Sequence, residues 1–491
     1  MNATYNIENA GRRSRDLLLL VVCLAQFMVI LDVSVVNVAL PSIRHGLHFS
    51  TTGLQWVVNA YTITFGGFLM LGGRAADLLG RRLVFVTGTA AFALCSLICA
   101  LASSRGLLLG ARAAQGLAGA LLSPATLSII TSTFRDGPER NRALGAWGAM
   151  GGLGASSGAL LGGVLTQTFS WPAIFAVNVP LGAAVIALGF KVVPAGCARD
   201  ERAERNFDVF GAVLVTAGLA LATFGIVRSD ALGWGSAGVL GPLAAAVALL
   251  GAFAMVEQRF ATAPLVPLRI FRQRQLTAAN ATVVLLYMGL FSMFFFVTLY
   301  LQQVLRYDAL DAGFAFLPMT LAVSSGSTLA PRLVRRFGLR AVLGGGMLLA
   351  TAGLLYLTGV KPGGSYFAQV LPGGILCGLG MGLALVSGTV AAVQGVPAEQ
   401  SGLASGLLNS SRLVGGALGL AVLSTVAASQ SHGAVSSVPL TNGFSLAFLV
   451  GAGFTVVGAI AAFAFLRPRP PALRPVATGP ERESEPEPLA A

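Results

Sequence analysis

Charged side chains are scarce in this chain of 491 residues: Asp, Glu, Lys and Arg together make up 10% of it. Soluble domains carry about a quarter charged residues. Apolar residues reach 55% instead, and the mean hydropathy is +0.78. This scarcity of charge excludes a soluble globular protein and indicates an integral membrane protein.

Paired cysteines, clustered histidines and catalytic motifs are also missing. Four of the five Cys lie in apolar runs and none shows paired spacing, which predicts small core residues rather than a disulfide or zinc framework. The Cys residues are Cys23, Cys95, Cys99, Cys197 and Cys377. The three His fall in short loops, at His45, His48 and His432, and no metal site is expected. Because G-x-x-x-x-G-K-[ST], H-E-x-x-H and G-x-S-x-G are absent, the sequence predicts neither an enzyme nor a nucleotide-driven pump, and no cofactor.

Long apolar runs are what the chain has in abundance. Each is close to the ~20 residues that a helix needs to cross a bilayer, and none alternates with the period of a strand. Fourteen can be placed, at about residues 17–40, 54–73, 83–102, 106–132, 143–167, 173–193, 209–228, 238–256, 277–301, 312–331, 340–360, 367–391, 402–427 and 443–466. The chain is therefore predicted to be an all-α membrane protein with fourteen transmembrane helices.

The basic residues indicate how these spans are oriented. Of the 32 Lys and Arg residues, 25 lie in the two terminal segments and the loops on their side, and five lie in the opposite loops. Basic residues concentrate on the cytoplasmic side of membrane proteins. Both termini are thus predicted to be cytoplasmic, in a bacterial cell (inner) membrane. The net charge of +13 is then a topology signal, and no nucleic acid partner is expected.

Two weak internal matches suggest a duplication. Residues 73–82 recur in degraded form at 331–340, and the segment 139–145 is echoed at 399–405. Similar offsets predict two six-helix bundles with two helices inserted between them, and many secondary transporters have duplicated halves. The predicted organisation is a cytoplasmic N-terminus at 1–16, an N-terminal bundle at 17–193, a cytoplasmic loop at 194–208, two inserted helices at 209–256, a cytoplasmic loop at 257–276, a C-terminal bundle at 277–466 and a disordered cytoplasmic tail at 467–491.

One acid lies deep inside an apolar run. Asp32 is about eight residues from the outer end of the first span, and Arg112 about six from the outer end of the fourth, so both lie roughly 9–12 Å deep and are placed to pair. A charge at mid-membrane costs roughly 2.5–3.5 kcal/mol, so a chain that keeps one is expected to use it, for carrying a proton or pairing with a cation. The alternative for Arg112 is a side chain that extends outward to the headgroups.

The loop between the second and third spans reads Gly73-Arg74-Ala-Ala-Asp77-Leu-Leu-Gly80-Arg81-Arg82. An ordinary cytoplasmic loop needs its Arg residues but explains neither the acid nor the glycine spacing. The loop resembles the signature G-x-x-x-D-x-x-G-R-[RK] of the major facilitator superfamily. This resemblance implies the major facilitator fold, with the loop as a conformational latch in which Asp77 contacts the N-terminal end of span thirteen, near residues 398–402.

Glycines form a smooth stripe along span five, on which another helix can lie closely. The set is Gly145, Gly154, Gly158, Gly162 and Gly163. Its spacing resembles the helix-packing motif of exporters in that superfamily, which is usually absent from importers. The family pattern has Pro where this chain has Ala159, so a kink is removed and import stays open as an alternative.

Three further stretches resemble the fourteen-span drug:proton antiporters within the superfamily, and the likeness covers residues 15–466. They are Leu31-Asp32-Val-Ser-Val-Val-Asn37-Val-Ala-Leu-Pro41, Trp171-Pro-Ala-Ile-Phe-Ala-Val-Asn178-Val-Pro180-Leu-Gly182 and Asp208-Val-Phe-Gly211. The R-x-x-Q-G pattern that begins at Arg112 resembles the proton-coupling motif of such antiporters. The resemblance implies that Asp32 and Arg112 couple proton movement to transport.

The function that this resemblance implies is export of amphiphilic small molecules, such as drugs or antibiotics, in exchange for protons by alternating access. The protein is expected to work as a monomer in the lipid bilayer. Its substrate cavity is expected to draw on Gln26, Asn37, Trp56, Tyr61, Gln115, Tyr287, Phe291 and Tyr300, whose aromatics suit flat apolar or cationic compounds. Two alternatives stay open, an importer of a small metabolite and a non-transporting membrane sensor or scaffold with a transporter fold.

Overall fold

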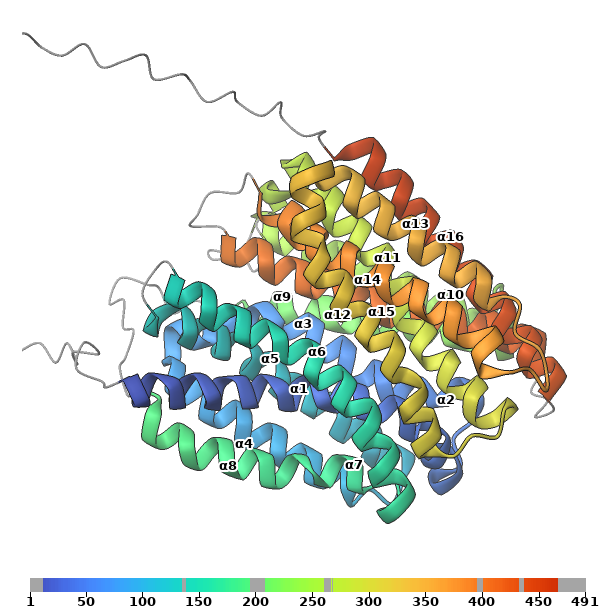
Figure 1. Cartoon of the computed structure of the whole chain (residues 1–491), viewed down its shortest axis with the longest axis horizontal. Coiled ribbons are helices and arrows are strands. Elements are labelled where there is room, and N and C mark those ends of the chain that lie inside the picture. The colour runs from blue at the N-terminus through green and yellow to red at the C-terminus, as the bar shows by residue number, and fades with distance from the viewer. Residues whose placement is uncertain are drawn as a thin grey trace, which may run out of the picture.

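The computed structural model describes residues 12–134, 138–194, 208–259, 266, 268–394, 401–431 and 437–466. All regular structure in these residues is helical (Figure 1). The elements are α1 (Arg12–Leu47), α2 (Thr51–Leu54), α3 (Trp56–Leu79), α4 (Arg81–Ala100), α5 (Arg105–Thr133), α6 (Pro138–Phe169), α7 (Ala173–Ala176), α8 (Asn178–Val192), α9 (Val209–Leu232), α10 (Ala237–Arg259), the 3₁₀-helix η2 (Leu268–Arg272), α11 (Arg274–Leu299), the π-helix η3 (Tyr300–Val304), α12 (Ala309–Phe337), α13 (Leu339–Leu357), the π-helix η4 (Tyr366–Val370), α14 (Leu371–Val393), α15 (Ser401–Ser431) and α16 (Ser437–Phe465).

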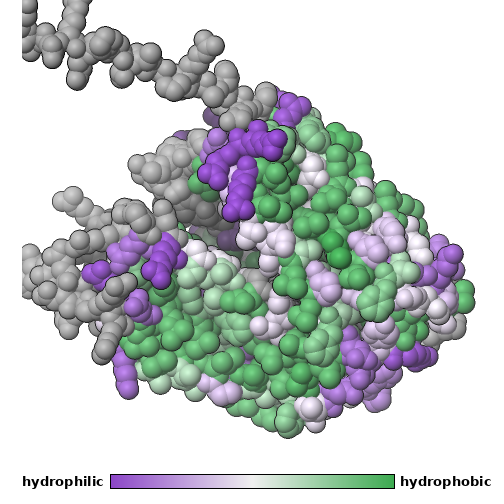
Figure 2. Space-filling model, viewed as in Figure 1, coloured by the Kyte–Doolittle hydropathy of each residue, from purple (hydrophilic) through white to green (hydrophobic). Residues whose placement is uncertain are grey.

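Each predicted span corresponds to one of these helices or to a helix with a short neighbour. Thirteen of the described helical stretches are long and apolar enough to cross a membrane. The second predicted span is α3, whose apolar sequence also carries polar residues such as Asn59 and Thr62. The sixth is divided into α7 and α8. Figure 2 shows the matching surface, a broad apolar zone with polar side chains gathered toward two ends.

The helices form two bundles and an inserted pair. Helices α1 and α3 to α8 pack among themselves, as do α11 to α16. The bundles meet where α6 packs against α12 and where α3 packs against α15. Of the inserted pair, α9 packs against both α3 and α15 at the second seam, and α10 packs mainly against α9. The first inserted helix therefore contacts both bundles.

The two bundles repeat a local backbone feature. Gly80 separates α3 from α4 with φ +100°, and Gly338 separates α12 from α13 with φ +85°. Both lie in the left-handed region that glycine adopts without steric penalty. The internal sequence match between residues 73–82 and 331–340 is thus accompanied by the same helix break in each bundle.

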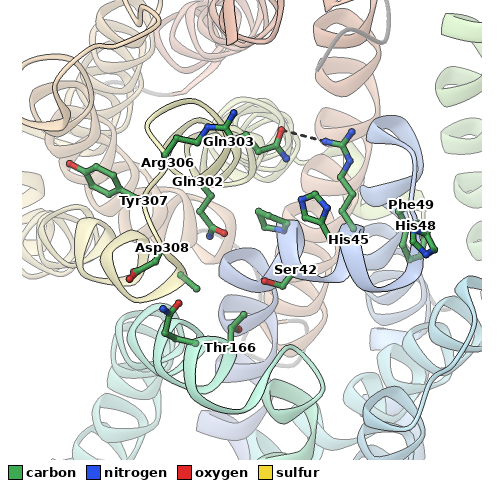
Figure 3. Close-up of a pocket in the computed structure, with 14 residues that line it drawn as sticks. Ser42, His45, His48, Phe49, Thr166, Gln302, Gln303, Arg306, Tyr307 and Asp308 are labelled. Atoms are coloured by element: carbon green, nitrogen blue, oxygen red, sulfur yellow. Dashed lines mark hydrogen bonds between the residues drawn. The ribbon is translucent and has the colours of Figure 1, made fainter. Parts of the chain in front are cut away.

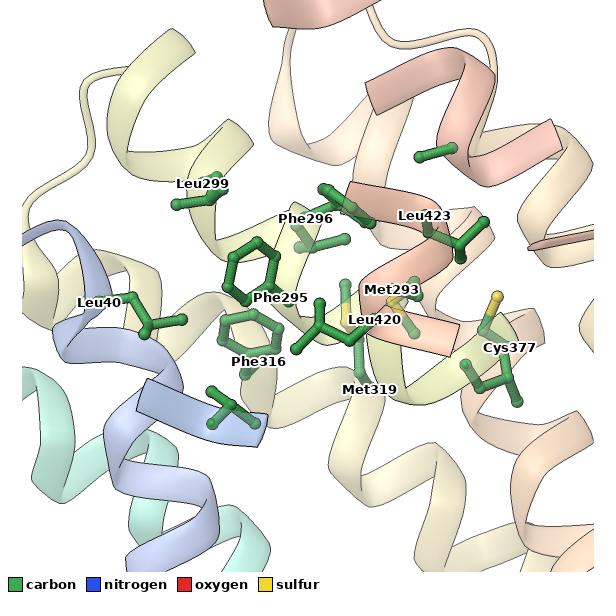
Figure 4. Packing of buried hydrophobic residues seen from close by; sticks show 14 of the residues in the cluster. Leu40, Met293, Phe295, Phe296, Leu299, Phe316, Met319, Cys377, Leu420 and Leu423 are labelled. Atoms are coloured by element: carbon green, nitrogen blue, oxygen red, sulfur yellow. The ribbon is translucent and has the colours of Figure 1, made fainter. Parts of the chain in front are cut away.

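The largest buried hydrophobic cluster joins the bundles at one end, and two smaller clusters join α3 to α15 along the other seam. The second half of α1, from Val35 to Ile43, belongs to a buried cluster that continues into α11, α12 and α15. Figure 4 shows Leu40 of α1 beside Phe295 and Phe316 of the other bundle. The first half of α1 belongs to a second cluster, whose fully buried members all lie in the N-terminal bundle. The bundles are therefore sealed together at the end where α1 finishes, which is the predicted outer end.

Candidate functional site

Asp32 lies where these two core clusters meet, on the middle of α1. Its side chain is 0% exposed, and both carboxylate oxygens accept hydrogen bonds. Oδ2 accepts from Arg112 Nη1 at 2.6 Å, while Oδ1 accepts from Gln115 Nε2 at 2.8 Å and from Asn178 Nδ2 at 2.9 Å. The two charges that the sequence placed at matching depth therefore form a buried ion pair.

Arg112 of α5 does not extend outward to the headgroups, since it is 1% exposed. Its Nε donates to the backbone oxygen of Val57 at 3.0 Å, and its guanidinium carbon lies 4.4 Å from the ring centroid of Tyr61 and 5.6 Å from that of Phe175. A guanidinium over an aromatic face gains a cation–π attraction that is strongest away from water. Contacts from α3 and α7 thus hold the cation of α5 beside Asp32.

Two amides and a hydroxyl complete a closed polar network. Gln115 accepts from Arg112 Nη1 at 2.7 Å through Oε1, and its Nε2 donates to Ser96 Oγ at 2.7 Å as well as to Asp32. Asn178, at the start of α8, donates to the same Ser96 oxygen at 3.4 Å. Buried polar groups are stable when their partners are present and costly when one is removed. Asp32 is therefore coupled to α4, α5 and α8 at once.

The sequence prediction missed Asn178 and Ser96 as members of this site and assigned Tyr61 and Gln115 to a substrate cavity. Asn178 carried a usable signal, because it is a polar residue at the start of an apolar span, but Ser96 carried none. Tyr61 stacks on Arg112, and its buried hydroxyl has no hydrogen-bond partner among the described residues. Tyr61 and Gln115 are here parts of the charge network.

The glycine stripe of α6 lies against the turn of α1 that carries Asp32. A Cβ atom on Gly154 would meet Ile30 at 2.9 Å, one on Gly158 would meet Ser34 at 2.6 Å, and one on Gly162 would meet the backbone oxygen of Val35 at 2.8 Å. Side chains at these positions would therefore push α1 away from α6.

The remaining glycines of the motif behave differently. Gly163 faces the other bundle, where an added Cβ would meet the backbone oxygen of Ala309 at 2.5 Å, while Gly145 has open space around it. Ala159, which stands where the family pattern has Pro, lies within an unbroken α6, and Gly313 of α12 packs against its backbone oxygen. This stretch of α6 is thus part of the seam between the bundles.

The predicted latch loop is only partly described. Arg81 Nε donates to Ser128 Oγ at 2.7 Å, and Arg82 donates to the backbone oxygen of Phe190 at 2.6 Å, so both fasten the loop to the N-terminal bundle. Gly73 lies against Pro124. Arg74 belongs to α3, as does Asp77, but the side chain of Asp77, residues 398–400 and the side chains of residues 401 and 402 lie outside the described part of the chain. The latch contact stays a prediction.

The other predicted cavity residues are dispersed. Gln26 accepts from Ser123 Oγ at 3.0 Å, and Asn37 donates to its own helix at 3.4 Å. Trp56 packs in a small cluster with α9 and α15, while Tyr287 and Phe291 pack against the shared core. Tyr300 departs most from the prediction: its hydroxyl donates to the backbone oxygen of Lys361 and lies 2.8 Å from Gln369, because η3 turns it toward the outer loop.

Comparisons with known proteins agree with this architecture. The sequence model of the Major Facilitator Superfamily matches residues 22–420 and, in a second match, 320–490. The chain is 39% identical to the cephamycin export protein CmcT of Amycolatopsis lactamdurans, over 96% of this chain and 97% of that protein. It is 40% identical to the puromycin resistance protein pur8 of Streptomyces alboniger, over 91% and 87%. The lincomycin resistance protein of Streptomyces lincolnensis is 36% identical, over 94% and 93%.

Solved structures share the fold at low sequence identity. A bacterial homolog of the human lysosomal transporter Spinster, solved in an inward-facing and unoccupied conformation, superposes with a TM-score of 0.65 at 15% identity, over 92% of this chain and 97% of that one. The nucleoside transporter NupG gives a TM-score of 0.63 at 14% identity, over 91% and 98%. The family match over most of the chain, the extensive sequence identity and the two-bundle fold lead to one conclusion: the chain is a membrane transporter and belongs to the major facilitator superfamily.

Proposed function

We propose that this chain exports amphiphilic small molecules across a bacterial cell membrane in exchange for protons, with both termini in the cytoplasm. The observation that carries the proposal is the sealed network around Asp32, a carboxylate whose hydrogen bonds come from three side chains on two other helices. The names of the relatives, which export or resist cephamycin, puromycin and lincomycin, support an antibiotic-like cargo.

The geometry supports Asp32 as the proton carrier because a proton on it would disturb several contacts at once. A protonated carboxyl group is a poorer acceptor for a guanidinium than a carboxylate is, since it has lost its charge and one oxygen becomes a donor. Protonation would therefore loosen Asp32 from Arg112 and weaken the hold of α1 on α5 and α8. Because the glycine stripe of α6 packs closely on α1, a movement of α1 would displace α6. Helix α6 in turn packs against α12 of the other bundle, so the displacement would reach the seam between the bundles.

The driving force is sufficient for such a cycle. One proton that enters down the membrane potential supplies about 2.3 kcal/mol per 100 mV. A shift of this size changes a two-state equilibrium by more than tenfold, since each 1.4 kcal/mol is a factor of about ten. Proton entry could therefore bias the alternation between a conformation sealed at the outer end and one sealed at the inner end.

The test uses everted membrane vesicles from a pump-deleted host, with the lumen acidified by respiration. Puromycin or lincomycin is added on the outside, which is the former cytoplasmic face, and proton release from the lumen is followed with a pH-sensitive dye. The wild-type chain should release protons when the compound is added, and Asp32→Asn should not. Asp311→Asn, which changes an exposed acid at the start of α12, serves as the matched control and should behave as the wild type.

The same vesicles test the direction of transport. Export predicts that the compound accumulates in the acidic lumen of everted vesicles. Accumulation instead in right-side-out cells, with protons moving alongside the compound, would identify an importer and contradict the proposal. Proton release from Asp32→Asn equal to that of the wild type would remove Asp32 from the coupling step.

A further inference from the structure

A cavity of about 760 Å³ lies between the bundles at the predicted outer end (Figure 3). One wall is the last turn of α1 with the end of α6, and the other is η3 with the start of α12. The volume is in the range of pockets that hold drug-sized ligands, about 300–1,000 Å³. Neither the sequence prediction nor the Asp32 site involves this cavity.

The walls of the cavity carry an excess of cationic and titratable groups. Arg44, His45 and His48 come from the α1 wall, and Arg306 comes from the opposite wall. Asp308 is the acid on the lining, and its Oδ1 already accepts from the backbone nitrogen of Asp311 at 2.7 Å. Two of the chain's three His and two Arg therefore meet in one cavity with a single, already engaged carboxylate.

This concentration runs against the charge bias of the chain. Only five of the 32 Lys and Arg residues fall in the loops of the predicted outer side, yet Arg44 and Arg306 both line this cavity. Basic residues on the outer side oppose the orientation signal of a membrane protein. Two of them in one cavity therefore call for a ligand that needs positive charge there.

The backbone supports the same interpretation on both walls. His48 has φ 54° and Arg306 has φ 61°, in the left-handed region that favours glycine or asparagine. Each follows the end of a helix, where glycine is the common residue. Positive charge at a helix C-terminus is favourable in itself, but that interaction does not require both side chains to line the same cavity.

Thr166 supplies an independent observation. It lines the cavity from the end of α6, its side chain is 8% exposed, and its hydroxyl has no hydrogen-bond partner among the described residues. A buried hydroxyl without a partner is unfavourable. A ligand with a hydrogen-bonding group in the cavity would satisfy it.

Side chains of this cavity also hold the outer seal. Gln302 Nε2 donates to the backbone oxygen of Val38 at 2.7 Å, and Arg44 Nη1 donates to Gln303 Oε1 at the longer distance of 3.4 Å (Figure 3). Both bonds connect α1 with the C-terminal bundle, one donated from each side. A carboxylate is a stronger acceptor for a guanidinium than a neutral amide is, so an anion in the cavity would take Arg44 from Gln303 and weaken the seal.

We propose that this cavity is an exit site that binds the negatively charged group of the exported amphiphile, a carboxylate foremost, and that this binding helps to release the outer seal. The inference rests on the proposed export function. It assigns anionic amphiphiles to the substrates, whereas the aromatic cavity predicted from the sequence suited apolar or cationic compounds. An anionic lipid headgroup has similar chemistry, and the experiment separates the two.

The experiment uses the full chain in phosphatidylcholine nanodiscs with two probes of the same shape, 1-naphthoate and its neutral counterpart 1-naphthamide. Dissociation constants are measured by calorimetry for the wild type, for the double variant Arg44→Gln/Arg306→Gln, and for the control Arg228→Gln. Arg228 is an outer-side arginine that lies over the Phe224 ring and does not line the cavity. Size-exclusion and thermal unfolding profiles establish that each variant is folded.

The wild type and the control should bind 1-naphthoate about tenfold or more tightly than 1-naphthamide, and the double variant should lose that preference. Thr166→Val leaves the charge of the cavity unchanged and should weaken naphthoate binding by a few fold. This variant tests the proposal even if the double variant does not fold. A wild type without preference, or a double variant that retains it, would overturn the proposal.

Two further readouts separate the possible failures. sn-Glycerol 3-phosphate should compete with naphthoate no better than inorganic phosphate does; stronger competition would assign the cavity to lipid headgroups and overturn the exit site. In everted vesicles the double variant should still release protons with puromycin through Asp32. If the wild type also released no protons with puromycin, the result would contradict the proposed export function and not the exit site.

Discussion

Each bundle carries an arginine deep within a predicted membrane span, Arg112 and Arg412, and the two are held in opposite ways. Arg112 of the N-terminal bundle is fully buried and paired with Asp32 at 2.6 Å. Arg412 of the C-terminal bundle lies about 16 Å along α15 from its start and is partly exposed. It donates to Thr389 Oγ1 at 2.7 Å and to Asn409 Oδ1 at 2.9 Å, both neutral acceptors. No ion pair to it occurs among the described residues.

This difference indicates that the two bundles of the duplicated fold have different roles. The helix breaks at Gly80 and Gly338 show that the bundles share a local design, but only the N-terminal one neutralises its arginine. A cation at mid-membrane without an acid is expensive, and the Nε of Arg412 has no partner within the described ranges. The N-terminal bundle thus holds the proposed proton carrier beside its arginine, while the C-terminal bundle holds its arginine through neutral acceptors.

The largest effect on stability is expected from Arg112→Gln. This change leaves Asp32 buried without its cation, which costs about 3–5 kcal/mol for a buried pair. Thermal unfolding of the purified protein should show a large drop in midpoint, and export should be lost. Asp32→Asn combined with Arg112→Gln should recover much of the stability but not the export; a single variant as stable as the wild type would show that the pair is not energetically coupled.

Next in size is Gly158→Val on α6. The new side chain would collide with Ser34, beside Asp32, and overpacking of this kind costs about 1–3 kcal/mol. Gly145→Val on the same helix makes the same chemical change where nothing lies within 4 Å. Unfolding midpoints should therefore separate the two variants, and equal midpoints would contradict the close packing of α6 on α1.

Alanine at the two helix breaks should have matched, smaller effects. Gly80→Ala and Gly338→Ala each force a Cβ into a left-handed backbone, at a cost of about 1 kcal/mol. Gly106→Ala, inside α5 with open space around it, is the control and should be neutral or slightly stabilising. Chemical denaturation of the three variants tests whether the two helix breaks are equivalent. A loss of stability in only one of Gly80→Ala and Gly338→Ala would show that they are not.

Arg412→Gln should have the smallest effect on stability, below about 1 kcal/mol, because its neutral partners are not left as unpaired charges. The thermal unfolding midpoint of the purified variant should therefore lie close to that of the wild type. A stability loss equal to that of Arg112→Gln would erase the contrast between the bundles.

Much of the fold was predictable because a bilayer imposes a strong pattern. The apolar runs located all the spans, and the depth of Asp32 and Arg112 along their helices anticipated the pair. The helices run past the predicted limits, as α1 does from Arg12 to Leu47, because hydropathy marks the hydrocarbon region and not the end of backbone hydrogen bonding. The sequence predicted a loop over residues 73–82, whereas α3 continues to Leu79 and the chain breaks only at Gly80.

The rest depended on how the helices are rotated and where their ends meet. Ser96 joins the Asp32 network only because α4 presents that face to α5 and α8, which no spacing within one helix specifies. Tyr300 looked like a cavity aromatic, but a π-helix turns it toward the outer loop. The outer cavity needs Arg44 and Arg306 from distant segments, and the left-handed backbone of His48 and Arg306 lies where sequence rules expect glycine.

The central claim is that Asp32 carries the proton that is exchanged for the exported compound. Proton release from the purified protein tests this claim most directly. Puromycin is added to the chain in weakly buffered nanodiscs, and the pH change is read with a soluble dye. At a starting pH acid enough to protonate Asp32, the account predicts release of up to one proton per wild-type chain at saturation, and none from Asp32→Asn that still binds puromycin. Equal release from both proteins would contradict it.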